Sequence, residues 1–94
     1  ELQINNELFE MKNLVRLSLS GIGIDKISPE IKNLKKLKWL ALNENKLEKL
    51  PEEICDLKNL ETLYIGSNKI KFLPDRFTEL KNLKKLSLID LDLS

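Results

Sequence analysis

Residues 37–57 read Leu37-Lys-Trp-Leu40-Ala-Leu42-Asn-Glu-Asn45-Lys-Leu47-Glu-Lys-Leu50-Pro51-Glu-Glu-Ile54-Cys-Asp-Leu57. The Leu-x-x-Leu-x-Leu segment that begins this stretch starts at Leu14, Leu37 and Leu83, and the copy at Leu60 has Ile65 in the last position, so that four copies follow one another 23 residues apart. A fixed period of about 20 to 50 residues indicates a solenoid, in which every repeat packs against its neighbours. We therefore divide the chain, as a single domain, into a partial repeat (1–13), three repeats (14–36, 37–59 and 60–82) and a second partial repeat (83–94).

The two halves of each repeat have different spacings of apolar residues. In the first half they alternate, as in Leu40-x-Leu42, which predicts short parallel strands. In the second half a proline and acidic residues precede apolar residues three positions apart, as in Pro51-Glu-Glu-Ile54, which favours a short helix or 3-10 turn. The predicted strands cover residues 17–19, 40–42, 63–65 and 86–88.

The complete set of columns, from Leu37 through Asn45 and Leu50-Pro51 to Leu57, resembles the leucine-rich repeat (LRR) family. Its tail is similar to the 23-residue subclass found in intracellular Ras-pathway scaffolds and in many bacterial LRR proteins. The resemblance implies an α/β repeat fold: a right-handed LRR solenoid with a short parallel β-sheet on the concave face and turns or 3-10 segments on the convex face. A coiled coil does not fit, because the spacing is not a heptad and three prolines would interrupt any long helix.

The resemblance also implies a structural role for the asparagine column. Asn45 and Asn68 are expected to point inward and to bond the backbone of neighbouring repeats. Ile22 and, at the other end, Leu91 replace asparagine in this column, so we expect a ladder of two asparagines only. Two glycines, Gly21 and Gly23, would let the backbone turn beside Ile22 without an amide.

The ends of the repeat array raise the question of what covers them. Ile4, Leu8 and Met11 fall on the three apolar columns of the second half, so the chain begins in the middle of a repeat. Neither end shows a dedicated polar or disulfide cap, which a solenoid usually needs. Two interpretations follow. The chain is a fragment or a small natural protein whose uncovered ends are tolerated, or the exposed edge strand 86–88 pairs with a second molecule of the chain.

Composition narrows the classes of partner and compartment. Lys plus Arg number 16 and Asp plus Glu 15, a net charge of +1, so no overall field favours nucleic acid or an acidic membrane. No run approaches the roughly 20 apolar residues of a membrane span, and the first residues do not resemble a signal peptide. The single cysteine and the lack of an Asn-x-Ser/Thr sequon favour a cytoplasmic location, with a secreted or cell-surface location as the alternative.

The residues that catalysis or metal binding would need are scarce. There is no histidine and one cysteine, which excludes Ser-His-Asp and Cys-His arrangements and the usual zinc ligand sets. Cys55 shares a column with Lys32 and Thr78, so we expect it on or near the convex surface as a thiol without a role. Acidic residues are interpreted as solvated charge, because they lie among lysines on the convex or terminal surfaces: Glu52, Glu53, Asp56, Asp90 and Asp92. We therefore predict no enzyme activity, cofactor or metal.

The outward positions of the strands are the ones that the fold leaves unconstrained. The only tryptophan and the only tyrosine, Trp39 and Tyr64, fall there on adjacent strands and should lie diagonally. Ala41 and Ile89 would extend this apolar centre, and the predicted rim is polar: Arg16, Asn43, Glu44 and Lys85. An aromatic centre with a polar rim is typical of a protein-binding hot spot.

Other interpretations of this surface and of the chain remain. In the simplest interpretation, Trp39 and Tyr64 only fill the concave surface and pack against the aliphatic parts of the Arg16 and Lys38 side chains. Stacking of single-stranded nucleic acid is disfavoured, because the patch carries few positive charges. The predicted function is non-catalytic protein binding by a scaffold, adaptor or receptor-like module. The alternatives are the recognition arm of a larger LRR enzyme, such as a kinase or ubiquitin ligase, and a structural solenoid that associates with itself through its open ends.

Overall fold

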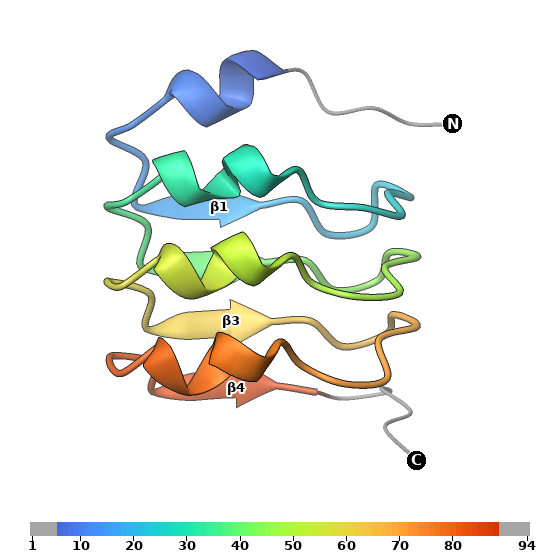
Figure 1. Cartoon of the computed structure of the whole chain (residues 1–94). Coiled ribbons are helices and arrows are strands. Elements are labelled where there is room, and N and C mark those ends of the chain that lie inside the picture. The colour runs from blue at the N-terminus through green and yellow to red at the C-terminus, as the bar shows by residue number, and fades with distance from the viewer. Residues whose placement is uncertain (1–5, 89–94) are drawn as a thin grey trace.

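Four short strands form one parallel sheet in a computed structural model that describes residues 6–88. They lie in chain order and are β1 (Arg16–Ser18), β2 (Trp39–Ala41), β3 (Thr62–Tyr64) and β4 (Lys85–Ser87). The pairing joins residues that are one 23-residue repeat apart, so that Leu17, Leu40, Leu63 and Leu86 form one row across the sheet. Figure 1 shows the repeats stacked one on another, which confirms the predicted LRR solenoid.

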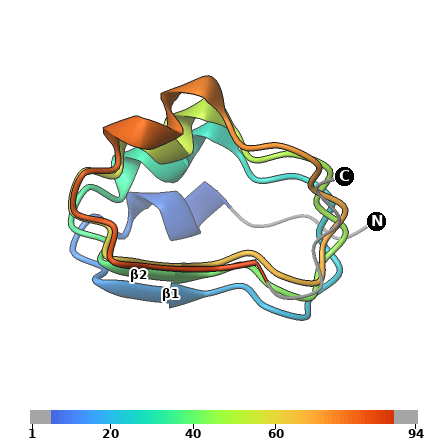
Figure 2. The same ribbon diagram turned by 90° about the horizontal axis from the view of Figure 1, so that it is seen from below.

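Each repeat returns through a five-residue 3-10 helix on the side opposite the sheet (Figure 2). These helices are η1 (Asn6–Glu10), η2 (Pro29–Asn33), η3 (Glu52–Asp56) and η4 (Asp75–Glu79). Prolines stand at the starts of the last three, where their missing N–H has no helical partner to lose. In η2 the Ser28 hydroxyl also accepts a hydrogen bond of 3.1 Å from the Glu30 N–H. The predicted 3-10 tails are therefore confirmed.

The strands begin and end one residue earlier than the alternating leucines predicted. Pairing starts early because the Lys38 and Trp39 N–H groups both donate to the Val15 carbonyl, at 2.8 and 3.1 Å. The leucine after each strand still donates across the sheet, as Leu19 does to the Ala41 carbonyl at 2.8 Å. Beyond that leucine the chain turns away, so the last predicted position contributes one bond and lies outside the regular ladder.

The core is a column of leucine and isoleucine side chains between the sheet and the 3-10 helices. In the repeat at 37–59, which has a neighbour on each side, Leu40, Leu42 and Ile54 are completely buried. In the last described repeat the equivalent Leu86 and Leu88 are only partly buried against the same cluster. Burial therefore depends on stacking, as expected of a solenoid.

Two asparagine side chains tie consecutive repeats together, as predicted. The Asn45 Oδ1 accepts hydrogen bonds from the N–H groups of Ile22, Gly23 and Ile24 at 3.1, 2.9 and 3.2 Å. Its Nδ2 donates to the Leu19 carbonyl of the preceding repeat at 2.9 Å and to the Leu42 carbonyl at 3.0 Å. Asn68 repeats this arrangement one step along, accepting from the Leu47 N–H at 3.0 Å and donating to the Leu42 carbonyl at 3.0 Å.

The glycines beside Ile22 differ in what they contribute. Gly21 has φ +68°, but Glu44 and Ser67, the equivalent residues of the next repeats, adopt φ 61° and 54° as well. In the three described turns this position is therefore left-handed whatever its side chain, with or without an asparagine after it. Gly23 has φ +78°, and no residue of its column in the described repeats shares this conformation. The special backbone of the first turn is thus located at Gly23.

The N-terminal end of the core is covered, contrary to expectation. Helix η1 lies across that end, inside the outline of the other repeats (Figure 2), and its Phe9 is only 1% exposed. Met11, which was predicted in an apolar core column, is 53% exposed. Helix η1 packs on the leucine column through Phe9, its largest apolar side chain, rather than through Met11. Ile4 lies outside the described residues.

An ion-pair network joins η3 to η4. The Arg76 guanidinium contacts Asp56 Oδ1 at 2.6 Å and Glu79 Oε1 at 3.0 Å, and Lys58 Nζ contacts the same Glu79 oxygen at 3.0 Å. The hydrogen bond from Arg76, reinforced by that from Lys58, lowers the pKa of Glu79 to about 2. Arg76 likewise lowers the pKa of Asp56.

None of the helices in residues 6–88 combines the length and the apolar character that crossing a bilayer requires.

The asparagine ladder predicts a stability cost that can be measured. Asn45→Ala removes the partner of buried backbone groups of Leu19, Ile24 and Leu42, so we expect the free energy of unfolding to fall by about 1–3 kcal/mol. Urea unfolding followed by circular dichroism measures this loss. The matched control is Asn59→Ala, because the Asn59 amide is exposed and makes a single bond to the Lys35 carbonyl. Equal effects of the two substitutions would contradict the role given to Asn45.

The η3–η4 network predicts that stability falls in acid. The pKa of Glu79 is lower in the folded chain, about 2, than its ordinary value of 4.5, so the unfolded chain binds the proton more tightly. The contribution of Glu79 is present above pH 4.5 and is lost as the pH falls towards 2. We expect Glu79→Gln to reduce this pH dependence, measured as urea midpoints between those limits. An unchanged pH dependence would show that the network does not stabilise the fold.

Candidate functional site

The outward side chains of the four strands form a surface that we call the sheet face. In each strand the middle leucine points into the core, so the first and third residues point outward. These outward residues are Arg16, Ser18, Trp39, Ala41, Thr62, Tyr64, Lys85 and Ser87. The inward leucines hold the backbone in place, and the outward side chains are therefore presented on a rigid frame.

Trp39 and Tyr64 meet in the middle of the sheet face. Trp39 is in register with Thr62, and Tyr64 with Ala41, so the two aromatic residues are diagonal neighbours on β2 and β3. Their ring centroids lie 5.6 Å apart with an angle of 79° between the planes, an edge-to-face contact. Such a pair contributes about 0.5–1.5 kcal/mol beyond the area that it buries. The predicted diagonal contact is confirmed, and both rings remain partly exposed.

A cation lies over each of the two rings. The Arg16 guanidinium carbon is 4.5 Å from the centroid of Trp39, and the Lys85 ammonium is 5.4 Å from that of Tyr64. A row therefore crosses the sheet from β1 to β4 in the order cation, aromatic, aromatic, cation. The cushioning of Trp39 by Arg16 was expected, whereas the contact between Lys85 and Tyr64 was not. Cation–π attraction orients all four side chains and leaves positive charge at both ends of the row.

Polar side chains lie where the chain leaves β1 and β2. The Ser20 hydroxyl donates a hydrogen bond of 2.6 Å to Asn43 Oδ1, which fixes the orientation of that amide. Ser20 was not among the predicted site residues, although its place in the same outward column as Asn43 could have indicated it. The exposed Glu44 stands at the left-handed turn position with φ 61°, and its N–H donates to the Gly66 carbonyl at 3.0 Å.

Ala41 does not have the exposure that was expected of it. Ala41 is only 3% exposed, because its short side chain lies between Ser18 and Tyr64 in the sheet and is covered by larger neighbours. It offers almost no surface to a partner and is corrected to a packing residue beneath the patch. Ile89 lies outside the described residues, as do Asp90 and Asp92. The described patch therefore consists of Trp39 and Tyr64 with the polar residues around them.

Cys55 is buried, and the prediction of a surface thiol is wrong. Its side chain is completely inaccessible, whereas its column neighbours Lys32 and Thr78 are exposed. Cys55 belongs to the core cluster, because η3 is packed between η2 and η4. Burial raises the pKa of the thiol, an effect that the nearby positive charge of Arg76 opposes. A buried, protonated thiol is a poor nucleophile.

Within residues 6–88, no group of three carboxylate or thiol side chains is placed to hold a metal ion.

The burial of Cys55 predicts a slow thiol reaction. In the folded chain a water-soluble disulfide reagent such as DTNB should modify Cys55 only as fast as the structure opens, whereas in urea the reaction should be complete within mixing. The absorbance of the released thiolate measures both rates. Rapid stoichiometric labelling of the native chain would show that Cys55 is accessible after all.

Comparisons with known proteins agree with this architecture. The family model described as a leucine-rich repeat region matches residues 2–94. A solved structure of an LRR protein from Leptospira interrogans has a TM-score of 0.86 and 38% identity over 95% of this chain, which spans 23% of that protein. Comparison with curated protein sequences gave no significant match. The chain therefore belongs to the leucine-rich repeat family.

Proposed function

We propose that this LRR domain is a non-catalytic protein-binding module that holds its partner on the sheet face, with Trp39 and Tyr64 as the anchors. The observation that carries the proposal is the row of two rings and two cations that crosses all four strands. LRR domains commonly mediate protein–protein interactions, which supports a binding role. The aromatic and cationic side chains of the sheet face are our reason for placing the binding site there.

The energetics of the rings support their role as anchors. Tryptophan, tyrosine and arginine are the residues most often found at interface hot spots, and the two aromatic side chains bury a large area for only two rotatable bonds each. Here Trp39 and Tyr64 are already held by their mutual contact and by Arg16 and Lys85. Little side-chain entropy is left to lose on binding, so more of the contact energy contributes to affinity.

The charges around the rings indicate the chemistry of the partner. Arg16 and Lys85 place a positive charge at each end of the row, about the apolar centre. The Asn43 amide is oriented by Ser20 and can still donate through its nitrogen. A partner segment with apolar residues in the middle and carboxylates on either side would complement this arrangement.

The test uses the two anchors together. Trp39→Ala with Tyr64→Ala removes both rings while leaving every core leucine in place, so circular dichroism should show a folded chain. With a partner isolated by pull-down and then purified, isothermal titration should show binding weaker by about tenfold or more, as expected for hot-spot aromatics.

Met11→Ala is the matched control, because Met11 is an exposed apolar side chain in the loop after η1, away from the sheet. The control should bind as the wild type does. Undiminished binding by a folded double variant would refute the sheet face as the partner site.

A further inference from the structure

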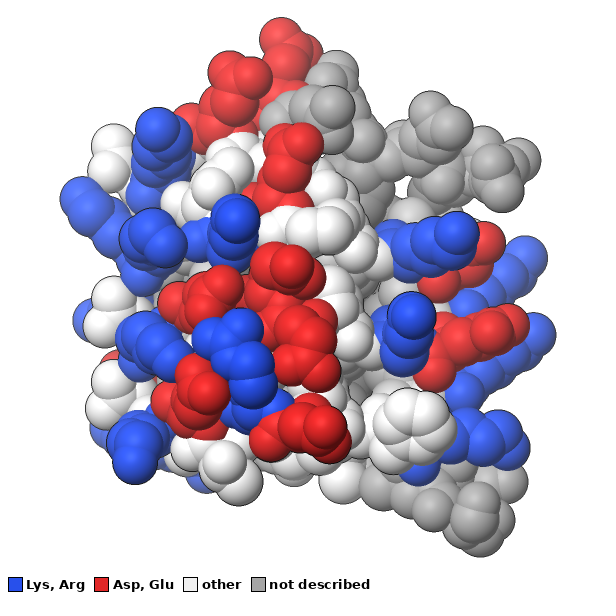
Figure 3. All heavy atoms as spheres, viewed as in Figure 1, with Lys and Arg blue, Asp and Glu red and all other residues white. Residues whose placement is uncertain are grey.

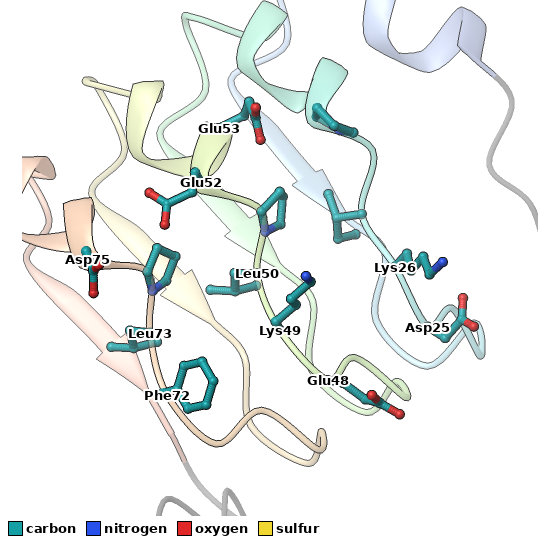
Figure 4. A pocket seen from close by; sticks show the side chains of 14 residues that line it. Asp25, Lys26, Glu48, Lys49, Leu50, Glu52, Glu53, Phe72, Leu73 and Asp75 are labelled. Atoms are coloured by element: carbon teal, nitrogen blue, oxygen red, sulfur yellow. The ribbon is translucent and has the colours of Figure 1, made fainter.

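A groove lies on the side of the 3-10 helices, away from the sheet face. It has a volume of about 850 Å³ and receives residues from three consecutive repeats. Figure 4 shows Leu50 and Leu73 in its middle, with Glu52, Glu53 and Asp75 on the helix side. Lysines 26 and 49 line the opposite side, where the loops enter the helices. The groove thus has an apolar floor and charged walls.

The groove has an excess of negative charge. Five acidic residues line it, and only two lysines do: Asp25, Glu48, Glu52, Glu53 and Asp75 against Lys26 and Lys49. Figure 3 shows acidic side chains gathered over the helices, beside a hollowed strip of uncharged residues. An occupant of this groove should therefore carry positive charge.

The acidic residues of the helix-side wall are available to such an occupant. Among the described residues, Glu52, Glu53 and Asp75 take part in no ion pair. Farther along the same helices, in contrast, Asp56 and Glu79 are already paired with Arg76 and Lys58. The unpaired negative charge of η3 and η4 is therefore concentrated at the groove.

An exposed aromatic ring completes the lining. Phe72 is 74% exposed and occupies the column in which the two preceding repeats have Lys26 and Lys49. Its ring adjoins the apolar part of the groove, together with Pro51 and Pro74. Arginine suits such a surface better than lysine, because its planar guanidinium stacks on an aromatic face and also binds a carboxylate through two parallel hydrogen bonds.

We propose that this groove binds an extended segment of a partner protein that contains arginine beside an apolar residue. The guanidinium pairs with Glu52, Glu53 or Asp75, and the apolar residue covers Phe72 and the prolines. The lysines of the opposite wall disfavour a segment that is basic throughout, so the ligand is of mixed character. This site lies on the opposite side from the sheet face and does not rest on the function proposed for Trp39 and Tyr64.

A synthetic peptide tests the proposal directly. The probe is acetyl-Gly-Arg-Leu-Arg-Gly-amide, added to the ¹⁵N-labelled chain at low salt and followed by amide chemical shifts. We expect shifts concentrated at residues 48–53 and 71–75. The double variant Glu52→Gln with Glu53→Gln, and separately Phe72→Ala, should each raise the Kd by about threefold or more, as expected for loss of partly exposed contacts.

The controls separate this site from general charge attraction. Glu30→Gln is the matched variant, because Glu30 holds in η2 the position that Glu53 holds in η3 and does not line the groove. It should leave the Kd unchanged, and a peptide with glutamate in place of arginine should not bind.

Three results would overturn the proposal. The first is equal weakening by Glu30→Gln, and the second is shifts that concentrate on the sheet face. The third is a concentration-dependent shift of the groove amides without peptide that Phe72→Ala abolishes, because the occupant would then be a second copy of the chain.

Discussion

Every repeat of this chain can bury its leucines only against the repeat before and the repeat after it. Leu40 and Ile54, with neighbours on both sides, are completely buried, while Leu86 in the last described strand is not. The buried amide of Asn45 serves the same constraint, since it bonds the backbone of the preceding repeat where no strand can pair. On the N-terminal side of the described repeats, Phe9 of helix η1 packs on the leucine column and is itself buried.

Stacking with a strict period also places outward side chains side by side without using them for folding. Because the register never shifts, a residue at one outward position lies beside its equivalents from the adjacent repeats. On the sheet Arg16, Trp39 and Lys85 occupy equivalent positions, and Tyr64, two residues farther along its strand, contacts Trp39 diagonally and lies beneath Lys85. On the helix side it gathers unpaired carboxylates and Phe72 around a groove. The solenoid thus carries two separate surfaces whose chemistry is set by side chains that the core does not need.

Equivalent positions of the repeats are not equally exposed. Cys55 is buried, although Lys32 and Thr78, which hold the same position in the neighbouring repeats, are exposed. Met11 stands in an apolar column but is exposed, because η1 packs on the leucine column through Phe9 instead. Ala41 was counted as surface from its outward direction, although the larger side chains around it cover it. The groove on the helix side was not predicted. Its one signal in the sequence was Phe72, which stands at the position where the two preceding repeats have lysine.

The sequence by itself determined the solenoid, the parallel register, the inward leucines, the two asparagines and the diagonal meeting of Trp39 and Tyr64. The register, the inward leucines and the diagonal pair follow from the 23-residue period and from the alternation of side chains along a strand, whereas the role of the asparagines was implied by the resemblance to the LRR family. Only the tertiary structure decided which equivalent positions are truly exposed, that η1 closes one end, and which carboxylates Arg76 leaves unpaired. Those properties depend on how large each neighbouring side chain is and on which repeats flank it, and neither is encoded in the period.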